Sequence, residues 1–244
     1  MGDTKIPYAK KTWNVVTGCN KISAGCRNCY AERWAIRLAG RSGYPKKNPF
    51  TVTLHKDRLQ EPRKWRKPQR IFVCSMGDLF HERVLCRWLY QIYGEMNALP
   101  RHEFIVLTKR PFNLQSFLFR HSQYASSNII HMVSCENQKM AEHRLSILTE
   151  IKFKFGYQFR IGVSVEPMLG PIDLKPWIGR LDWVICGCES GSGRRPCDPA
   201  WIKGLRDQCV AVGIPFFLKQ MEIGGEIIEM PKLNGRVWDQ YPRE

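Results

Sequence analysis

Short apolar runs alternate with segments of helical periodicity along most of this chain. The runs are continuous rather than alternating, and they are rich in Ile, Val, Leu and Phe. Strands that are buried on both faces have this pattern, as in a parallel sheet covered by helices. The pattern predicts strands at residues 12–16, 71–74, 104–107, 128–133, 159–165, 183–186 and 215–218.

Helical spacing of apolar residues follows most of these runs, and it predicts helices after residue 29 and at residues 84–96, 111–119, 138–148 and 199–212. The alternation of strands and helices indicates βαβ units with right-handed crossovers. We therefore expect an α/β protein built as a partial parallel (β/α) barrel of the TIM type, with about 6–7 strands. A doubly wound open sheet is the alternative.

One segment interrupts this alternation, at about residues 41–70. It holds ten Lys and Arg against two acidic residues, and Tyr44, Phe50 and Trp65 are interleaved with them. Such a mixture suits a surface that follows phosphates and stacks on bases, whereas the alternative is a solvated loop whose aromatic residues pack back on the barrel. We expect a single barrel over residues 1–220 that carries this basic insertion. A C-terminal extension follows over residues 221–244, with a hairpin around Asn234-Gly235.

The formal net charge of +16 is large for 244 residues. A strongly basic balance favours contact with polyanions, most simply nucleic acid, although a merely basic surface is the alternative. No apolar run reaches the ~18 residues of a membrane span, and the N-terminus lacks the apolar segment of a secretory signal. We therefore expect a cytoplasmic protein with no membrane partner.

Each apolar run ends abruptly in polar or small residues. In a parallel barrel the carboxyl ends of all strands lie on one face, where barrel enzymes place their chemistry. The alternative is that these residues are ordinary polar loop residues. The sequence predicts a functional mouth that includes Ser75, Asp78, Lys109, Arg110, Ser134, Cys135, Glu136, Asn137, Glu166, Cys188, Glu189 and Lys219.

Three cysteines, Cys19, Cys26 and Cys29, form a C-x6-C-x2-C array after the first predicted strand. A long cytosolic chain does not need disulfides, so such thiols suit a metal. Structural zinc takes four ligands, whereas three cysteines on a cubane leave one iron open. An iron–sulfur cluster is the prediction; zinc and no metal are the alternatives. Three further cysteines in apolar patterns, Cys74, Cys86 and Cys209, are expected in the core.

Several stretches resemble known families. The cysteine array after the first strand of a partial barrel resembles the radical SAM (S-adenosyl-L-methionine) superfamily, and more narrowly the chain resembles the phage Gp37/Gp68-type protein family. The barrel and cysteines are similar to those of spore photoproduct lyase-type radical SAM enzymes. The matching stretches are residues 12–14 (TWN), 17–19 (TGC), 26–32 (CRNCYAE), 75–81 (SMGDLFH), 107–111 (LTKRP), 164–172 (SVEPMLGPI), 182–185 (DWVI), 189–191 (ESG) and 215–220 (PFFLKQ).

The resemblance implies a 4Fe–4S cluster on Cys19, Cys26 and Cys29 that binds SAM, yields a 5′-deoxyadenosyl radical and takes electrons from a flavodoxin or ferredoxin. Lys109, Arg110 and Lys219 are assigned to substrate phosphate. Cys135 and Cys188 are assigned to hydrogen-atom donation. The residues expected around SAM are Tyr30, Ser75, Asp78, Ser134, Glu136, Asn137, Glu166 and Glu189.

With the basic charge, the resemblance predicts a nucleic-acid base or nucleotide as substrate, in DNA modification or repair. Two alternatives stay open: a non-enzymatic nucleic-acid-binding protein with a structural zinc, and a protein with a vestigial cluster. The chain departs from the superfamily in its first cysteine gap, which is six residues where three are common. Asn28 also stands where an aromatic residue usually precedes the third cysteine.

Overall fold

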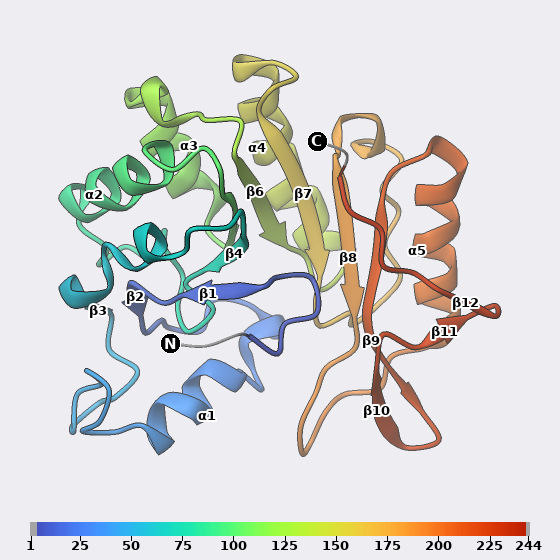
Figure 1. Ribbon diagram of the computed structural model, residues 1–244. Helices are drawn as coiled ribbons and strands as arrows, with labels where there is room; N and C mark the ends of the chain where they lie inside the picture. Colours follow the sequence, from blue (N-terminus) through green and yellow to red (C-terminus); the bar gives the residue numbers. More distant parts are fainter. Residues whose placement is uncertain (1–3, 243–244) are drawn as a thin grey trace. The chain divides into compact units, whose positions relative to one another are not determined.

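A mostly parallel sheet of eight strands organises the fold (Figure 1). The computed structural model describes residues 4–242, so the first three residues of the expected barrel and the last two of the expected extension lie outside the described residues. All seven predicted strands are present, and an eighth pairs with the last of them in antiparallel. In sheet order the strands are β1 (Lys11–Trp13), β4 (Arg70–Val73), β5 (Glu103–Thr108), β6 (Ile129–Ser134), β7 (Arg160–Val165), β8 (Trp183–Gly187), β9 (Phe216–Ile223) and β10 (Glu226–Glu229).

The chain divides into two compact units, Met1–His131 and Met132–Glu244. In the first unit, β1 pairs in parallel with β4, and β4 pairs in parallel with β5. The central strand β4 has Ile71, Phe72 and Val73 at 5% exposure or less, because it is covered on both faces. This burial explains its continuous apolar sequence. The helices of this unit are α1 (Tyr30–Arg37), α2 (Cys86–Asn97) and α3 (Pro111–Arg120).

The basic insertion is partly folded against the first unit. Its strand β3 (Thr53–Leu54) pairs in antiparallel with β2 (Val16–Thr17), which follows β1. Trp13 of β1 is fully buried, and its indole N–H donates to the Arg58 carbonyl oxygen at 2.8 Å. Tyr44 is buried in a small cluster with α1. Phe50 is half-buried and packs against the same cluster, so two of the three interleaved aromatic residues are packing residues.

In the second unit, β7 pairs in parallel with β8, and β8 with β9. Helix α5 (Pro199–Val212) has the predicted ends: the Asp198 carboxylate accepts from the Ala200 N–H at 2.8 Å, and Gly213 is left-handed at φ 73°. Helix α4 (Gln138–Phe155) is longer than predicted, because Ile151 and Lys152 extend its buried face. It ends where Gly156 takes φ 80°.

The predicted hairpin is present in the second unit: β11 (Lys232–Leu233) and β12 (Arg236–Val237) pair in antiparallel around Asn234 and Gly235, both of which have positive φ. Two of the three predicted core cysteines are buried, but Cys86 is exposed at the first position of α2, so that prediction is wrong. The apolar residues before Cys86 led to a predicted helix that starts at residue 84, two residues before α2 begins. Within the described part of the chain, every helix is too short or too polar to span a membrane.

Candidate functional site

The three predicted metal-binding cysteines lie on one loop of the first unit, between β2 and α1. Gly18 starts this loop at φ 89°, and a Cβ there would come within 2.3 Å of the Thr51 carbonyl oxygen. The position therefore requires glycine. A single 3-10 turn, Ala24–Cys26, follows, and Cys29 is the N-cap of α1. All three thiols are half-buried and free of disulfides.

The environments of the first two thiols differ. Burial and the nearby Asp78 carboxylate raise the pKa of Cys19 to about 11, although Arg110 opposes the shift. Burial also acts to raise the pKa of Cys26, but a backbone hydrogen bond from Ile22, the charge of Lys109 and the hydrogen bonds of Ser23 outweigh it, so that pKa is lowered. The thiolate therefore forms more readily at Cys26 than at Cys19.

No group of three or more His, Cys, Asp or Glu side chains converges tightly enough to hold a single metal ion, within residues 4–242. The thiols of Cys19, Cys26 and Cys29 are thus not drawn together as a metal site within those residues. The donor set on this loop is three thiols free of disulfides, and in type and number it matches a cubane with one iron left open.

Asp78, expected near SAM, lies at the end of β4 and is 6% exposed. The Asp78 carboxylate joins the segment after β4 to the end of β5, and both of its oxygens accept hydrogen bonds from the protein. It accepts hydrogen bonds from Phe80 N (3.0 Å), Thr108 Oγ1 (2.7 Å), Lys109 N (3.0 Å) and Arg110 Nη1 (3.1 Å).

Arg110, expected at substrate phosphate, is also 6% exposed and binds Asp78 and Glu82. Its Nη1 donates to Cys19 Sγ at 3.4 Å. The structure therefore brings two predicted site residues and one predicted cluster ligand into direct contact. Lys109 stays half-buried and acts on Cys26 through its charge.

Tyr30 and Ser75 are also brought together. The Tyr30 hydroxyl donates to the Ser75 carbonyl oxygen at 2.6 Å, and the ring is 45% exposed. The Ser75 hydroxyl donates to Asn14 Oδ1 at 3.1 Å, and the same oxygen accepts from Met76 N at 3.1 Å. Asn14, which the sequence analysis did not assign, thus fixes the segment after β4 to the segment after β1. Its only sequence signal was a place in the TWN stretch.

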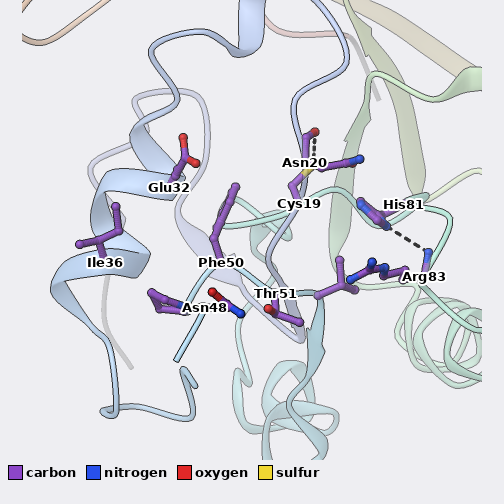
Figure 2. A pocket seen from close by; sticks show the side chains of 11 residues that line it. Cys19, Asn20, Glu32, Ile36, Asn48, Phe50, Thr51, His81 and Arg83 are labelled. Carbon is purple, nitrogen blue, oxygen red and sulfur yellow. Dashed lines mark hydrogen bonds between the residues drawn. The ribbon is translucent and has the colours of Figure 1, made fainter. Parts of the chain in front are cut away.

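A cavity of about 380 Å³ opens beside the cysteine loop (Figure 2). One wall comes from the basic insertion, which gives that segment a place at the site. The charged side chains that line the cavity are Glu32 and Arg83. His81 Nδ1, also at the cavity, accepts a hydrogen bond from Arg83 N at 3.0 Å. The lining residues are Cys19, Asn20, Glu32, Ile36, Asn48, Pro49, Phe50, Thr51, Val52, His81 and Arg83.

The second unit holds the remaining predicted carboxylates, and each is paired with a cation. Glu136 binds Arg144 at 2.9 Å, with both side chains at 2% exposure or less. Glu189 binds Arg195, whose Nε donates to Glu189 Oε2 at 2.9 Å. Arg144, the partner of Glu136, lies in the middle of α4, and no pattern in the sequence predicts this pairing. Asn137 caps α4 by accepting from Met140 N, and Ser134 gives its carbonyl oxygen to Arg144.

Glu166 and Lys219 form the most accessible of these pairs. Lys219 Nζ lies 2.9 Å from Glu166 Oε1, and the side chains are 24% and 13% exposed, respectively. The Ser164 hydroxyl donates to the other carboxylate oxygen at 3.0 Å. A Cβ on Gly187 would lie 2.9 Å from Glu166 Oε1, so glycine there leaves room for the carboxylate.

The two cysteines assigned to hydrogen-atom donation are both buried in the second unit. The Cys135 thiol donates to the Met140 carbonyl oxygen at 3.6 Å. Burial raises the pKa of Cys188 to about 11, and Gln220 bonds its backbone on both sides, at 3.2 and 2.8 Å. The raised pKa keeps Cys188 protonated at neutral pH, as a hydrogen-atom donor must be.

Structures of spore photoproduct lyase have a similar fold. The complex with a dinucleoside spore photoproduct matches at a TM-score of 0.51 and 12% identity, over 77% of this chain and 58% of that chain. A variant of the same enzyme matches at 0.51 and 15% identity, over 87% and 64%. The likeness confirms the fold class, an α/β protein with a mostly parallel sheet like the partial TIM barrel of that enzyme. This chain spans about three fifths of the length of the enzyme's chain.

The family is shown by the sequence itself. The chain belongs to the family described as protein of unknown function DUF5131, the Gp37/Gp68 family, which matches residues 3–242. A search of curated proteins found no match.

Proposed function

We propose that this protein is a radical SAM enzyme that holds a 4Fe–4S cluster through Cys19, Cys26 and Cys29 and acts on a nucleic-acid base or nucleotide. The observation that carries the proposal is the cysteine loop: it holds three half-buried thiols, and one of them, Cys19, lines a cavity, on a fold like that of spore photoproduct lyase. When bound, the cluster and SAM would supply one-electron chemistry and hydrogen-atom abstraction.

The residues around the loop have defined tasks in this proposal. Asp78, Arg110 and Asn14 hold the loop and the strand ends in place. Lys109 favours the thiolate form of Cys26, which is the form that binds iron. The cavity beside Cys19 gives a substrate or SAM a route to the loop. In the second unit, Glu166 and Lys219 are the accessible charged groups that can orient a polar ligand.

The substrate class rests on charge and on the likeness. A net charge of +16 favours a polyanionic partner, and Arg83 is the basic side chain among the residues that line the cavity. Spore photoproduct lyase was solved with a dinucleoside photoproduct. A nucleic-acid base or nucleotide is the ligand that fits both observations, and a flavodoxin or ferredoxin would supply the electrons.

The test is anaerobic reconstitution with iron and sulfide, followed by a SAM-cleavage assay with DNA, RNA and nucleotides offered in turn. We expect about four irons per chain and release of 5′-deoxyadenosine on reduction. Cys26→Ser should lose most of the iron. Cys86→Ser is the matched control, because that thiol is exposed and lies on α2, away from the cysteine loop in sequence.

The alternatives give different results. One colourless zinc per chain would replace the proposal with a zinc-binding protein. A full cluster without 5′-deoxyadenosine under any condition would indicate a vestigial cluster. Equal iron in Cys26→Ser and the wild type would overturn the assignment of the loop.

A further inference from the structure

Arg110 occupies an unusual position for an arginine. It lies between β5 and α3, as the N-cap residue of α3, and its backbone N–H donates to Thr108 Oγ1 at 2.9 Å. Its side chain points into the protein and is only 6% exposed. A buried guanidinium is costly unless its donors are satisfied, so the surroundings show what this side chain is built to hold.

The guanidinium contacts two separate segments of the first unit. Its Nε donates to Glu82 Oε1 at 2.8 Å, and its Nη1 donates to Asp78 Oδ2 at 3.1 Å, which anchors it to the segment after β4. The same Nη1 donates to Cys19 Sγ at 3.4 Å, and Nη2 donates to the carbonyl oxygen and Oδ1 of Asn20 in the cysteine loop. One planar group thus joins the strand ends to the first cysteine.

We propose that Arg110 is a positioning residue for the cysteine loop, and that its hydrogen bond to Cys19 Sγ raises the reduction potential of a cluster held by that sulfur. This inference rests on the proposed function. A donor to a ligand sulfur stabilises the extra negative charge of the reduced cluster, and hydrogen bonds to sulfur are among the factors that set the potential of such clusters.

The directed hydrogen bond, more than the net charge, carries this effect. Asp78 and Glu82 lie on the same guanidinium and offset its positive charge. The Arg110 guanidinium thus offers Cys19 Sγ an N–H donor whose position is fixed by the two carboxylates. Lysine cannot reproduce this arrangement, because its single ammonium lacks the planar fork that reaches a carboxylate and the loop together.

Two variants test the inference, Arg110→Gln and Arg110→Lys, with Arg87→Gln as the control. Arg87 is an exposed arginine on α2. The reconstituted proteins are compared by iron and sulfide content and by a redox titration followed by electron paramagnetic resonance. Both Arg110 variants should bind less cluster, and the cluster that remains should be harder to reduce by at least tenfold in its reduced-to-oxidised ratio, which is 59 mV for one electron. Arg87→Gln should match the wild type.

Arg110→Lys keeps a buried positive charge beside Asp78. Its iron content and reduction potential can therefore be measured even if Arg110→Gln does not fold. A wild-type potential and iron content in Arg110→Lys would overturn the inference while leaving the proposed function intact. Absence of iron in the wild-type protein would instead overturn the proposed function, and the inference with it.

Discussion

The two units of this protein use buried charge in different ways. In the first unit, Asp78, Glu82 and Arg110 form one shared network that also takes in the Cys19 thiol. In the second unit the carboxylates at the strand ends form the pairs Glu136–Arg144, Glu166–Lys219 and Glu189–Arg195, and the Glu136 charge also acts on Arg195. A shared network fixes a loop, because moving one member disturbs the others. The pairs of the second unit differ in burial, and burial separates their roles.

Burial separates the pairs of the second unit clearly. The side chains of Arg144 and Glu136 are 2% and 1% exposed, whereas those of Lys219 and Glu166 are 24% and 13% exposed. A pair with no exposed surface cannot meet a ligand without unfolding its surroundings. Glu136, predicted near SAM from the sequence, therefore supports α4 through Arg144, and the Glu166–Lys219 pair is the one that we propose meets a ligand.

The largest expected effect comes from breaking the buried pair. Arg144→Met leaves the Glu136 carboxylate buried without its cation, which should lower the free energy of unfolding by about 3–5 kcal/mol. Denaturant unfolding measures this change. Combining it with Glu136→Gln should restore most of the loss, because no buried charge remains. A single variant within 1 kcal/mol of the wild type would contradict the structural role of this pair.

An intermediate effect is expected from the network of the first unit. Asp78→Asn removes the charge that binds Arg110 and cannot serve all four donors, which should cost about 2–3 kcal/mol in the free energy of unfolding. Asp57→Asn is the control, since Asp57 is exposed on the 3-10 turn Lys56–Arg58, and its change should stay within about 0.5 kcal/mol. Equal losses in the two variants would show that the network does not hold the strand ends together.

The smallest effect on stability is expected at the accessible pair. Lys219→Met should lower the free energy of unfolding by about 1–2 kcal/mol, because Lys219 is partly exposed but the Glu166 oxygen that it contacts is buried. The same denaturant experiment applies. A loss as large as that of Arg144→Met would remove the distinction between a structural pair and a ligand-facing pair.

The sheet could be predicted from the sequence because burial on both faces leaves a direct trace, as in residues 71–74 and 183–186. The ends of α5 were equally readable from Asp198 and Gly213. Side-chain partners were not. Asp78 and Arg110 were each assigned to a ligand from their places at strand ends, but the sequence did not show that they bind each other.

The insertion shows a second limit of sequence reasoning. Its charge and aromatic residues predicted a surface for nucleic acid, but pattern alone could not show that Tyr44 is buried or that residues 48–52 line a cavity. These outcomes depend on how the segment folds back along β2, through long-range pairing that leaves no periodic trace.

The close approach of Gly18 to Thr51 limits how this protein can be re-engineered. The N–H of Cys19 donates to the Phe50 carbonyl oxygen at 3.2 Å, and β2 pairs with β3 directly behind. The cysteine loop and residues 50–54, which are distant in sequence, therefore form one structural unit. If the loop is transplanted into another scaffold, or the insertion is exchanged between relatives, the cysteine loop and residues 50–54 must be transferred together.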